Sequence, residues 1–572
     1  MDRADPRPSP ALRLCFWCIT TVVSFLQIWA RRHTMNPDAV SYVEIAQAAL
    51  HIGVKGLVNA YWSPLYPALL AVIFRAFHPP LFWESTVIHL LSFLLVFVNL
   101  ACFEVFLREL IRVQYSQAPA NLSMPLPPRT LWICGYILFI WSSQFWLRSD
   151  LTSPDVLVAA VAYLATAILL RILAGNEAWT TFGTLGIVLG LGYLAKTVMF
   201  PLAFVFLASA VLLAPSFRRA FPRALLASAI FLVICAPLVV ALSRSKGRLT
   251  FGDSGTINYA EFVNQVDPRF DHWQGQPPGT GIPAHPTREL SPAPPLFEFA
   301  TPISGSYPPW YDPSYWYDGV QTHFSLSQQT RALLHSLNLY LRIFSQTGAL
   351  YFVFLALFIL LRNSGPWGSG IRSYWAVWLP CYAALGMYAL VNVEPRYIAW
   401  AALMLLMMVF SGVRVPSSSQ RPLIPRIALL VAIAPAVAIA VSTGQNLAAI
   451  ARPRPFEAWD VAQGLQRMGI PPGSGVGFIG IGFDDYWAHL AGVHIVAEIP
   501  DWGMARFWDA DPETKSKIMS QFAASGAACV VTKSVPPEAA AQGWKQIDGT
   551  AYSLWEIRGR PRQTAGRVSA KN

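Results

Sequence analysis

The chain has 572 residues, of which 54% are hydrophobic and only 13% are charged, about half the charged share of an ordinary soluble protein. Runs of about 20 apolar residues recur along it, and each can cross roughly 30 Å of hydrocarbon. This composition excludes a disordered chain, a fibrous protein and a cytosolic enzyme, and the continuous apolar runs exclude a membrane β-barrel. The net charge of +11 indicates basic cytoplasmic loops rather than nucleic-acid binding, since no basic run carries interleaved aromatic residues.

The apolar runs predict a helical multipass membrane protein with eleven spans, near residues 12–30, 84–107, 130–147, 154–171, 179–195, 198–214, 224–243, 338–361, 373–391, 397–413 and 427–444. With the N-terminus inside, the cytoplasmic side carries 15 arginines, against 7 arginines and lysines on the short outer segments, which agrees with the positive-inside rule. Residues 61–77 are also apolar, but a span there would turn the basic loops outward. They contain Pro64 and Pro67 and are expected to form an interfacial or re-entrant segment.

This orientation leaves three extracytoplasmic pieces, which are the loops 31–83 and 244–337 and the chain beyond about residue 445. We expect residues 1–444 to form a transmembrane domain and residues 445–572 a small extracytoplasmic α/β domain with a disordered tail, because short apolar runs alternate there with polar helical ones. The expected strands are 476–481, 494–499, 528–533 and 552–557. A GxGxxG pattern lies inside the first of these strands rather than after it, at Gly475, Gly477 and Gly480, so it does not favour a nucleotide site.

The first outer loop contains NPDAVSYVEIAQAAL (36–50), which predicts a helix with Asn36 as its N-cap and Pro37 in its first position. Apolar residues recur in it at helical spacing, which favours an amphipathic helix on the membrane surface. Asp38 lies in the first turn and is either a carboxylate favoured by the helix dipole or a general base at the mouth of a membrane cavity. Glu44, the second acid of this helix, is either a solvated carboxylate or a site residue.

Two further ionisable groups lie at the outer ends of predicted spans. Asp155 follows Pro154 at the start of the fourth span and is either a capping carboxylate or a site residue. Lys196 ends the fifth span, and an ionisable residue at that depth indicates a functional site unless it snorkels to the outer surface. Gly186 and Gly190 in the same span form a small-xxx-small pair, which predicts close helix packing.

The short segment VNVEPRYIAW (391–400), between the ninth and tenth spans, places Glu394 and Arg396 at the outer mouth of the helix bundle. A planar guanidinium suits a phosphate group, and the alternative is a local ion pair that opens the tenth span. Six of the fourteen residues in SYPPWYDPSYWYDG (306–319) are Tyr or Trp. They are either rings that stack on sugars or aromatic residues of the membrane interface.

Several of these motifs, in this order and on one side of the membrane, resemble the bacterial GT-C glycosyltransferases of the protein mannosyltransferase and aminoarabinose transferase type. The resemblance covers about residues 12–444, and its motifs are NPDAVSYVEIA, YWSPLYPALL (61–70), the PD before the fourth span, Lys196 and EPRY (394–397). It implies an enzyme of the bacterial cytoplasmic (inner) membrane that uses a polyprenyl-phosphate sugar on the extracytoplasmic side, with an acidic residue of the first loop as base. Asp38 matches that position, but the second adjacent acid that many members carry is missing.

From this resemblance we expect a hexosyl- or pentosyltransferase that moves its sugar to an envelope lipid, glycan or protein with inversion at the anomeric carbon. Asp38 would take the acceptor proton, while Lys196 and Arg396 would stabilise the departing phosphate. The other candidates for contacting the substrates are Glu394, Tyr397, Asp155 and Glu44. No cofactor is expected besides the lipid-linked donor, no residues have the spacing of metal ligands, and a metal requirement stays open. The alternatives are a flippase or transporter of lipid-linked sugars and a non-catalytic envelope scaffold.

Overall fold

The computed structural model describes residues 7–116, 123–266, 288–299, 304–345, 367–412, 414–416, 429, 432–533, 535–540 and 542–557. They divide into two compact units, and each is described by itself. The first unit comprises residues 1–34, 46–264 and 324–454, and the second comprises residues 35–45, 265–323 and 455–572. Parts of both outer loops thus group with the C-terminal region. The expected disordered tail falls on residues 558–572, which lie outside the described part of the chain.

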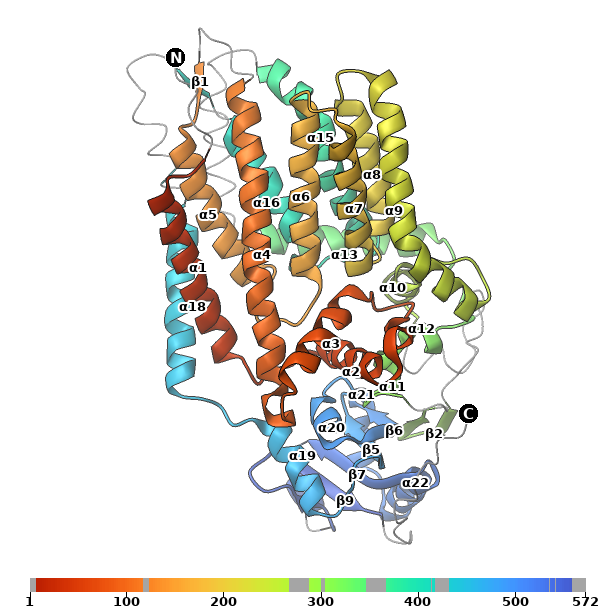
Figure 1. The fold of residues 1–572 in the computed structure, drawn as a ribbon. Coiled ribbons are helices and arrows are strands. Elements are labelled where there is room, and N and C mark those ends of the chain that lie inside the picture. Colours follow the sequence, from red (N-terminus) through yellow and green to blue (C-terminus); the bar gives the residue numbers. More distant parts are fainter. Residues whose placement is uncertain are drawn as a thin grey trace. The chain divides into compact units, whose positions relative to one another are not determined.

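The first unit is a bundle of apolar helices (Figure 1). Within the described part, five helices are long and apolar enough to cross a membrane: α1 (Pro10–Ala30), α4 (Leu81–Ser116), α6 (Asp155–Leu173), α9 (Phe217–Lys246) and α18 (Ile433–Ala451). Shorter apolar helices are α3 (Leu65–Phe77), α7 (Trp179–Ala195), α8 (Met199–Leu213) and α16 (Pro395–Gly412). The remaining elements are α5 (Pro128–Phe145), α10 (Ser254–Phe262), α13 (Leu326–Ser345), α15 (Trp367–Ala389), the 3-10 turn η1 (Gly53–Leu57) and the paired strands β1 (Ser123–Pro125) and β4 (Arg414–Pro416). The chain is a helical membrane protein, as the sequence predicts.

Helices overlap the predicted spans wherever the structure describes them, although α13 begins at Leu326 and α18 runs from Ile433 to Ala451, outside the predicted bounds. For the eighth span, α13 ends at Ser345, and residues 346–366 lie outside the described part. The interrupted segment 61–77 forms only the 13-residue helix α3. Such a helix is about 20 Å long, and the expectation that the segment does not cross the membrane stays a prediction.

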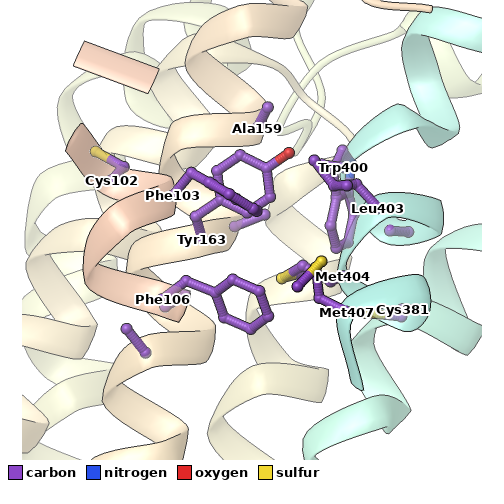
Figure 2. Packing of buried hydrophobic residues seen from close by; sticks show 14 of the residues in the cluster. Cys102, Phe103, Phe106, Ala159, Tyr163, Cys381, Trp400, Leu403, Met404 and Met407 are labelled. Atoms are coloured by element: carbon purple, nitrogen blue, oxygen red, sulfur yellow. The ribbon is translucent and has the colours of Figure 1, made fainter. Parts of the chain in front are cut away.

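Aromatic and sulfur-containing side chains fill the middle of this unit (Figure 2). Phe103 and Phe106 on α4 lie against Tyr163 on α6, with ring centroids 5.3 and 6.1 Å apart. Trp400 and Met404 on α16 face these rings, and all five side chains are buried. Large rings and flexible thioethers fill irregular gaps between helices, so this core fixes the helices whose ends carry the candidate site.

The predicted small-xxx-small contact on α7 is confirmed. A Cβ at Gly190 would lie 2.8 Å from the Ile234 side chain of α9, and one at Gly186 would overlap the Ala227 carbonyl oxygen. Glycine therefore lets the backbones of α7 and α9 approach closely.

The second unit is built on a seven-stranded sheet with the order β2-β3-β6-β5-β7-β9-β8. Its centre is parallel and consists of β5 (Gly475–Gly480), β6 (His494–Pro500) and β7 (Ala527–Lys533). Antiparallel strands flank this centre: β3 (Pro295–Glu298) and β2 (Arg288–Pro292) on one side, β9 (Tyr552–Glu556) and β8 (Lys545–Gln546) on the other. The four strands expected from the sequence are confirmed, whereas β2 and β3 come from the second outer loop and were not expected.

Helices complete this unit: α11 (Pro308–Tyr311), α12 (Pro313–Trp316), α19 (Glu457–Arg467), α20 (Tyr486–Ala491), α21 (Asp501–Trp508), α22 (Pro512–Ala524) and α23 (Pro537–Ala540). As expected, the GxGxxG glycines lie inside a strand, β5. A Cβ at Gly477 would overlap the Phe522 ring of α22, and one at Gly475 would lie 2.9 Å from the Gly526 carbonyl oxygen. These two glycines therefore serve close packing.

The helix expected in the first outer loop is α2 (Pro37–Ile52), and its first residues belong to the second unit. It starts after Asn36, as predicted, and the Asn36 carbonyl oxygen accepts the N–H of Ala39 at 2.9 Å. Five consecutive residues, Ala39 to Val43, are buried. The expectation of an amphipathic surface helix is therefore wrong, because a run of five covers every side of a helix.

Candidate active site

Lys196, Asp155 and Arg396 come together at helix ends of the first unit. Lys196 caps the C-terminus of α7, just before the short break that precedes α8. Asp155 is the first residue of α6, and Arg396 lies in the first turn of α16. Because each group sits where a helix begins or ends, the rigid bundle fixes all three positions.

A buried carboxylate holds the two cations. Lys196 Nζ donates to Asp155 Oδ1 at 2.6 Å, while Arg396 Nε lies 3.7 Å from Asp155 Oδ2. The hydroxyl of Ser153 donates to Asp155 Oδ2 at 3.1 Å. The side chain of Asp155 is 3% exposed, whereas those of Lys196 and Arg396 are 24% and 15% exposed. Asp155 therefore fixes two cations that remain partly accessible.

Glu394 and Tyr397 complete this cluster. Arg396 Nε donates to Glu394 Oε2 at 2.6 Å, and Lys196 Nζ lies 3.8 Å from the centroid of the Tyr397 ring, a cation–π contact. The formal charges of the two cations and the two carboxylates cancel. At 39% exposed, Glu394 is the most accessible of the four.

Two outer segments support the chain break that follows Lys196. The hydroxyls of Ser63 and Thr197 are 3.2 Å apart, which brings the YWSPLY turn next to the lysine. Gly252, with φ of +137°, leaves no room for a side chain, because a Cβ would lie 2.8 Å from Thr197. Neither Thr197 nor Ser153 was predicted from the sequence, since each is an ordinary hydroxyl without a local pattern.

Asp38 and Glu44 belong to the second unit and have different partners. Trp310 Nε1 donates to Asp38 Oδ1 at 3.3 Å, and the Ser41 hydroxyl donates to the Trp310 carbonyl oxygen at 2.9 Å. Glu44 Oε1 accepts the Ser306 N–H at 2.8 Å and lies 3.2 Å from His489 Nδ1. The side chain of Glu44 is only 11% exposed, so the expectation of a solvated carboxylate is wrong.

Asp485 is a second buried acid beside Glu44, and its contacts were not predicted from the sequence. It directly precedes α20, a position typical of a helix cap, but its Oδ2 accepts the Ser306 hydroxyl at 2.8 Å instead. Burial and, next, the charge of Glu44 raise the pKa of Asp485 well above its ordinary value. Its Oδ1 is buried without a hydrogen-bond partner among the described residues. A proton on this carboxyl removes the repulsion between the two acids.

The aromatic segment 306–319 divides into two sets. Tyr307, Trp316 and Tyr317 are buried, and the Tyr307 hydroxyl donates to the buried Glu498 of β6 at 2.8 Å. These three rings are core residues of the second unit rather than sugar-stacking or interfacial groups. Trp310, Tyr311 and Tyr315 are partly exposed, and burial followed by the charge of Glu44 raises the pKa of Tyr311 to about 12.

Comparison with known proteins finds similarity among solved structures. No family model and no curated protein matches the chain. The structure of ArnT from Cupriavidus metallidurans bound to undecaprenyl phosphate aligns with a TM-score of 0.54 and 13% identity, over 96% of this chain and 98% of ArnT. Apo ArnT gives 0.52 at 13% identity, over 95% and 97%. The Archaeoglobus fulgidus oligosaccharyltransferase gives 0.48 at 14% identity, over 91% of this chain and 68% of its own.

The two ArnT alignments span nearly the whole of both chains, so they include the helical bundle and the C-terminal sheet. Among the described residues, no three His, Cys, Asp or Glu side chains gather in a way that could hold a metal ion.

Proposed function

We propose that this chain, which has the GT-C glycosyltransferase fold that ArnT also has, transfers a sugar from a polyprenyl phosphate to a hydroxyl of an envelope lipid, glycan or protein. The observation that carries the proposal is the pair of partly exposed cations, Lys196 and Arg396, fixed by the buried Asp155. Such a pair suits the phosphate of a lipid carrier, and the similar ArnT binds undecaprenyl phosphate.

The reaction needs few groups. The acceptor oxygen attacks the anomeric carbon while Asp38 takes its proton, and the bond from that carbon to the phosphate oxygen breaks. The electron pair stays on the phosphate, which leaves as the polyprenyl phosphate anion, so no general acid is required. Attack opposite the leaving group inverts the anomeric centre.

Lys196 and Arg396 stabilise the charge that develops on the departing phosphate. Because Asp155 and Tyr397 already hold both cations, little reorganisation is needed as that charge appears. Glu394 leaves Arg396 when the phosphate arrives. Glu44 is held by protein groups on both sides, and we assign it to the support of α2 rather than to substrate contact.

We further propose that the reaction takes place on the extracytoplasmic side of a bacterial inner membrane. The excess of arginine in the loops on the opposite side supports this orientation.

The proposal is tested in a strain that lacks this protein, complemented with wild type or with Asp38→Asn. Mass analysis of envelope glycolipids and glycoproteins should show a sugar modification that wild type restores and Asp38→Asn does not, at equal membrane levels. The matched control is Asp484→Asn, an exposed acid, which should restore it fully. Full restoration by Asp38→Asn would remove Asp38 from the base role.

The alternatives predict other results. A flippase moves a lipid-linked sugar across vesicles of reconstituted protein without transfer to an acceptor. A scaffold keeps its function when Asp38, Lys196 and Arg396 are neutralised together.

A further inference from the structure

A row of polar contacts in the second unit runs along α2. Asp38, Ser41 and Glu44 follow at intervals of three residues, so they form a stripe on the helix surface. All three contact the segment 305–310: Asp38 accepts from the Trp310 ring, Ser41 donates to the Trp310 carbonyl oxygen, and Glu44 accepts from the Ser306 N–H. The orientation of the first turn of α2 is therefore tied to this segment.

The segment is in turn fixed to the C-terminal part of the unit. The Ser306 hydroxyl donates to Asp485, and the Ser306 carbonyl oxygen accepts the Ile495 N–H of β6 at 2.9 Å. His494 Nδ1 lies 2.7 Å from the Gly305 carbonyl oxygen. The contacts thus continue from the central sheet to α2 without interruption.

Gly305 lies very close to the side chains of Glu44 and Tyr311. Its φ is +72°, and a Cβ there would lie 2.5 Å from Glu44 Oε2 and 2.6 Å from the Tyr311 Cβ. Only glycine allows both this backbone conformation and this closeness to the Glu44 carboxylate.

His489 and Asp485 close the cluster around Glu44. The side chain of His489 is 5% exposed, and Asp485 and Ser306 are buried. A buried carboxylate that accepts both a backbone N–H and an imidazole N–H has one favoured position, because any other position leaves polar groups unsatisfied. The raised pKa of Asp485 supports this arrangement, since its protonated form does not repel Glu44.

We propose that Trp310 and the cluster of Glu44, Asp485 and His489 are positioning residues, through which the C-terminal domain sets the orientation of the Asp38 carboxylate. This inference rests on the proposed role of Asp38 as base. It gives the C-terminal domain a part in catalysis without contact to the substrates. A misplacement of about 1 Å costs a reaction about 100-fold, so such support affects the rate directly.

The first test separates kcat from KM. Trp310→Phe keeps an aromatic ring against Phe483, whose centroid is 4.9 Å away, but removes the N–H that Asp38 accepts. We expect kcat to fall at least about tenfold while KM for the lipid-linked donor stays within twofold. In an Asp38→Asn background the same change should have no further effect, because the two residues act as one unit. The control is Trp502→Phe, an exposed ring of α21, with unchanged kcat.

The second test needs no activity. Hydrogen exchange of residues 36–45 is measured in the full chain, in wild type, His489→Gln and Asp485→Ala. In both variants the amide hydrogens of residues 36–45 should exchange several-fold faster than in wild type. The control Asp484→Asn, which changes a neighbouring exposed acid, should match wild type. Glu44→Gln should raise the exchange rate as the other two variants do. Glu44→Asp, which keeps the carboxylate, should raise it less than Glu44→Gln.

The two proposals fail in different ways. If Asp38→Asn retains transfer, the proposed function fails, and the hydrogen-exchange result still tests the cluster. If Asp38→Asn is inactive but Trp310→Phe and His489→Gln show wild-type kcat, the positioning role is overturned alone. Unchanged exchange at residues 36–45 in both cluster variants would overturn it as well.

Discussion

The cluster around Asp155 in the first unit and the cluster around Glu44 in the second differ in composition and access. In the first unit, Lys196 and Arg396 are paired with carboxylates, their charges balance, and the cations are partly exposed. In the second unit, Glu44 and Asp485 lie close together in a buried setting, and His489 contacts Glu44. The cluster around Asp155, which is neutral overall and partly exposed, is suited to exchange one partner for a ligand. The buried cluster around Glu44 is suited only to hold its own chain in place.

The largest effect is expected from removing a cation of the cluster around Asp155. Lys196→Met or Arg396→Met should lower sugar transfer by at least about 100-fold, because the departing phosphate then loses one of its two charge partners. The measurement is the initial rate with reconstituted full-length protein and an undecaprenyl-phosphate-linked sugar. Arg396→Lys should recover only part of the rate, since an ammonium lacks the planar pair of donors.

The matched control for these cation variants is Lys55→Met, which removes an exposed charge of η1. It should leave the rate at the wild-type level. A wild-type rate in Arg396→Met would mean that the two clusters do not differ as described.

A smaller effect concerns stability and tests whether Asp155 is the fixed element of the cluster. Lys196→Met removes the partner at 2.6 Å and leaves a carboxylate that is 3% exposed, which should cost about 1–3 kcal/mol of unfolding free energy. Adding Asp155→Asn should recover much of that loss, because no uncompensated charge then stays buried. Denaturant titrations of both variants in detergent measure this, and a double variant less stable than Lys196→Met would contradict it.

Sequence patterns predicted the local parts of both regions. Apolar runs gave the helices and apolar stretches gave β5, β6, β7 and β9, because length and periodicity are visible within one segment. Charge in apolar surroundings also singled out Lys196, and the short segment between two predicted spans singled out Arg396. These signals depend only on neighbours in the chain.

What the sequence could not predict is pairing across long separations. Glu44 and His489 are 445 positions apart, and Lys196 finds Asp155 41 positions away. Strand β3 joins β6 from a loop rich in proline, where no alternation of apolar residues indicated a strand. Each of these contacts is decided by tertiary packing, which a single segment does not record.

The cluster of Glu44, Asp485 and His489 should make the stability of the protein depend on pH. Asp485 has a raised pKa when folded and an ordinary carboxyl pKa of about 4 when unfolded. Between these values the folded state binds a proton that the unfolded state does not, so the stability it contributes is complete below about pH 4 and is lost as the pH rises. Thermal midpoints of wild type should therefore fall relative to Asp485→Asn as the pH is raised from 5 to 9. Parallel curves for wild type and Asp485→Asn would show that folding does not raise the pKa of Asp485, and Asp484→Asn should follow wild type.

The smallest effect is expected from Glu394, the most exposed residue of the cluster around Asp155. The sign of the change in KM distinguishes this cluster from the one around Glu44. Glu394→Gln removes the carboxylate that, in our proposal, Arg396 exchanges for a phosphate. Because Glu394 is 39% exposed, solvent screens most of its attraction. Asp155 keeps Arg396 in place, so KM for the lipid-linked donor should fall up to a few-fold at low salt and the gain should shrink at high salt. A rise in KM would mean that Glu394 holds Arg396 in its working position, as Glu44 is held in its buried cluster.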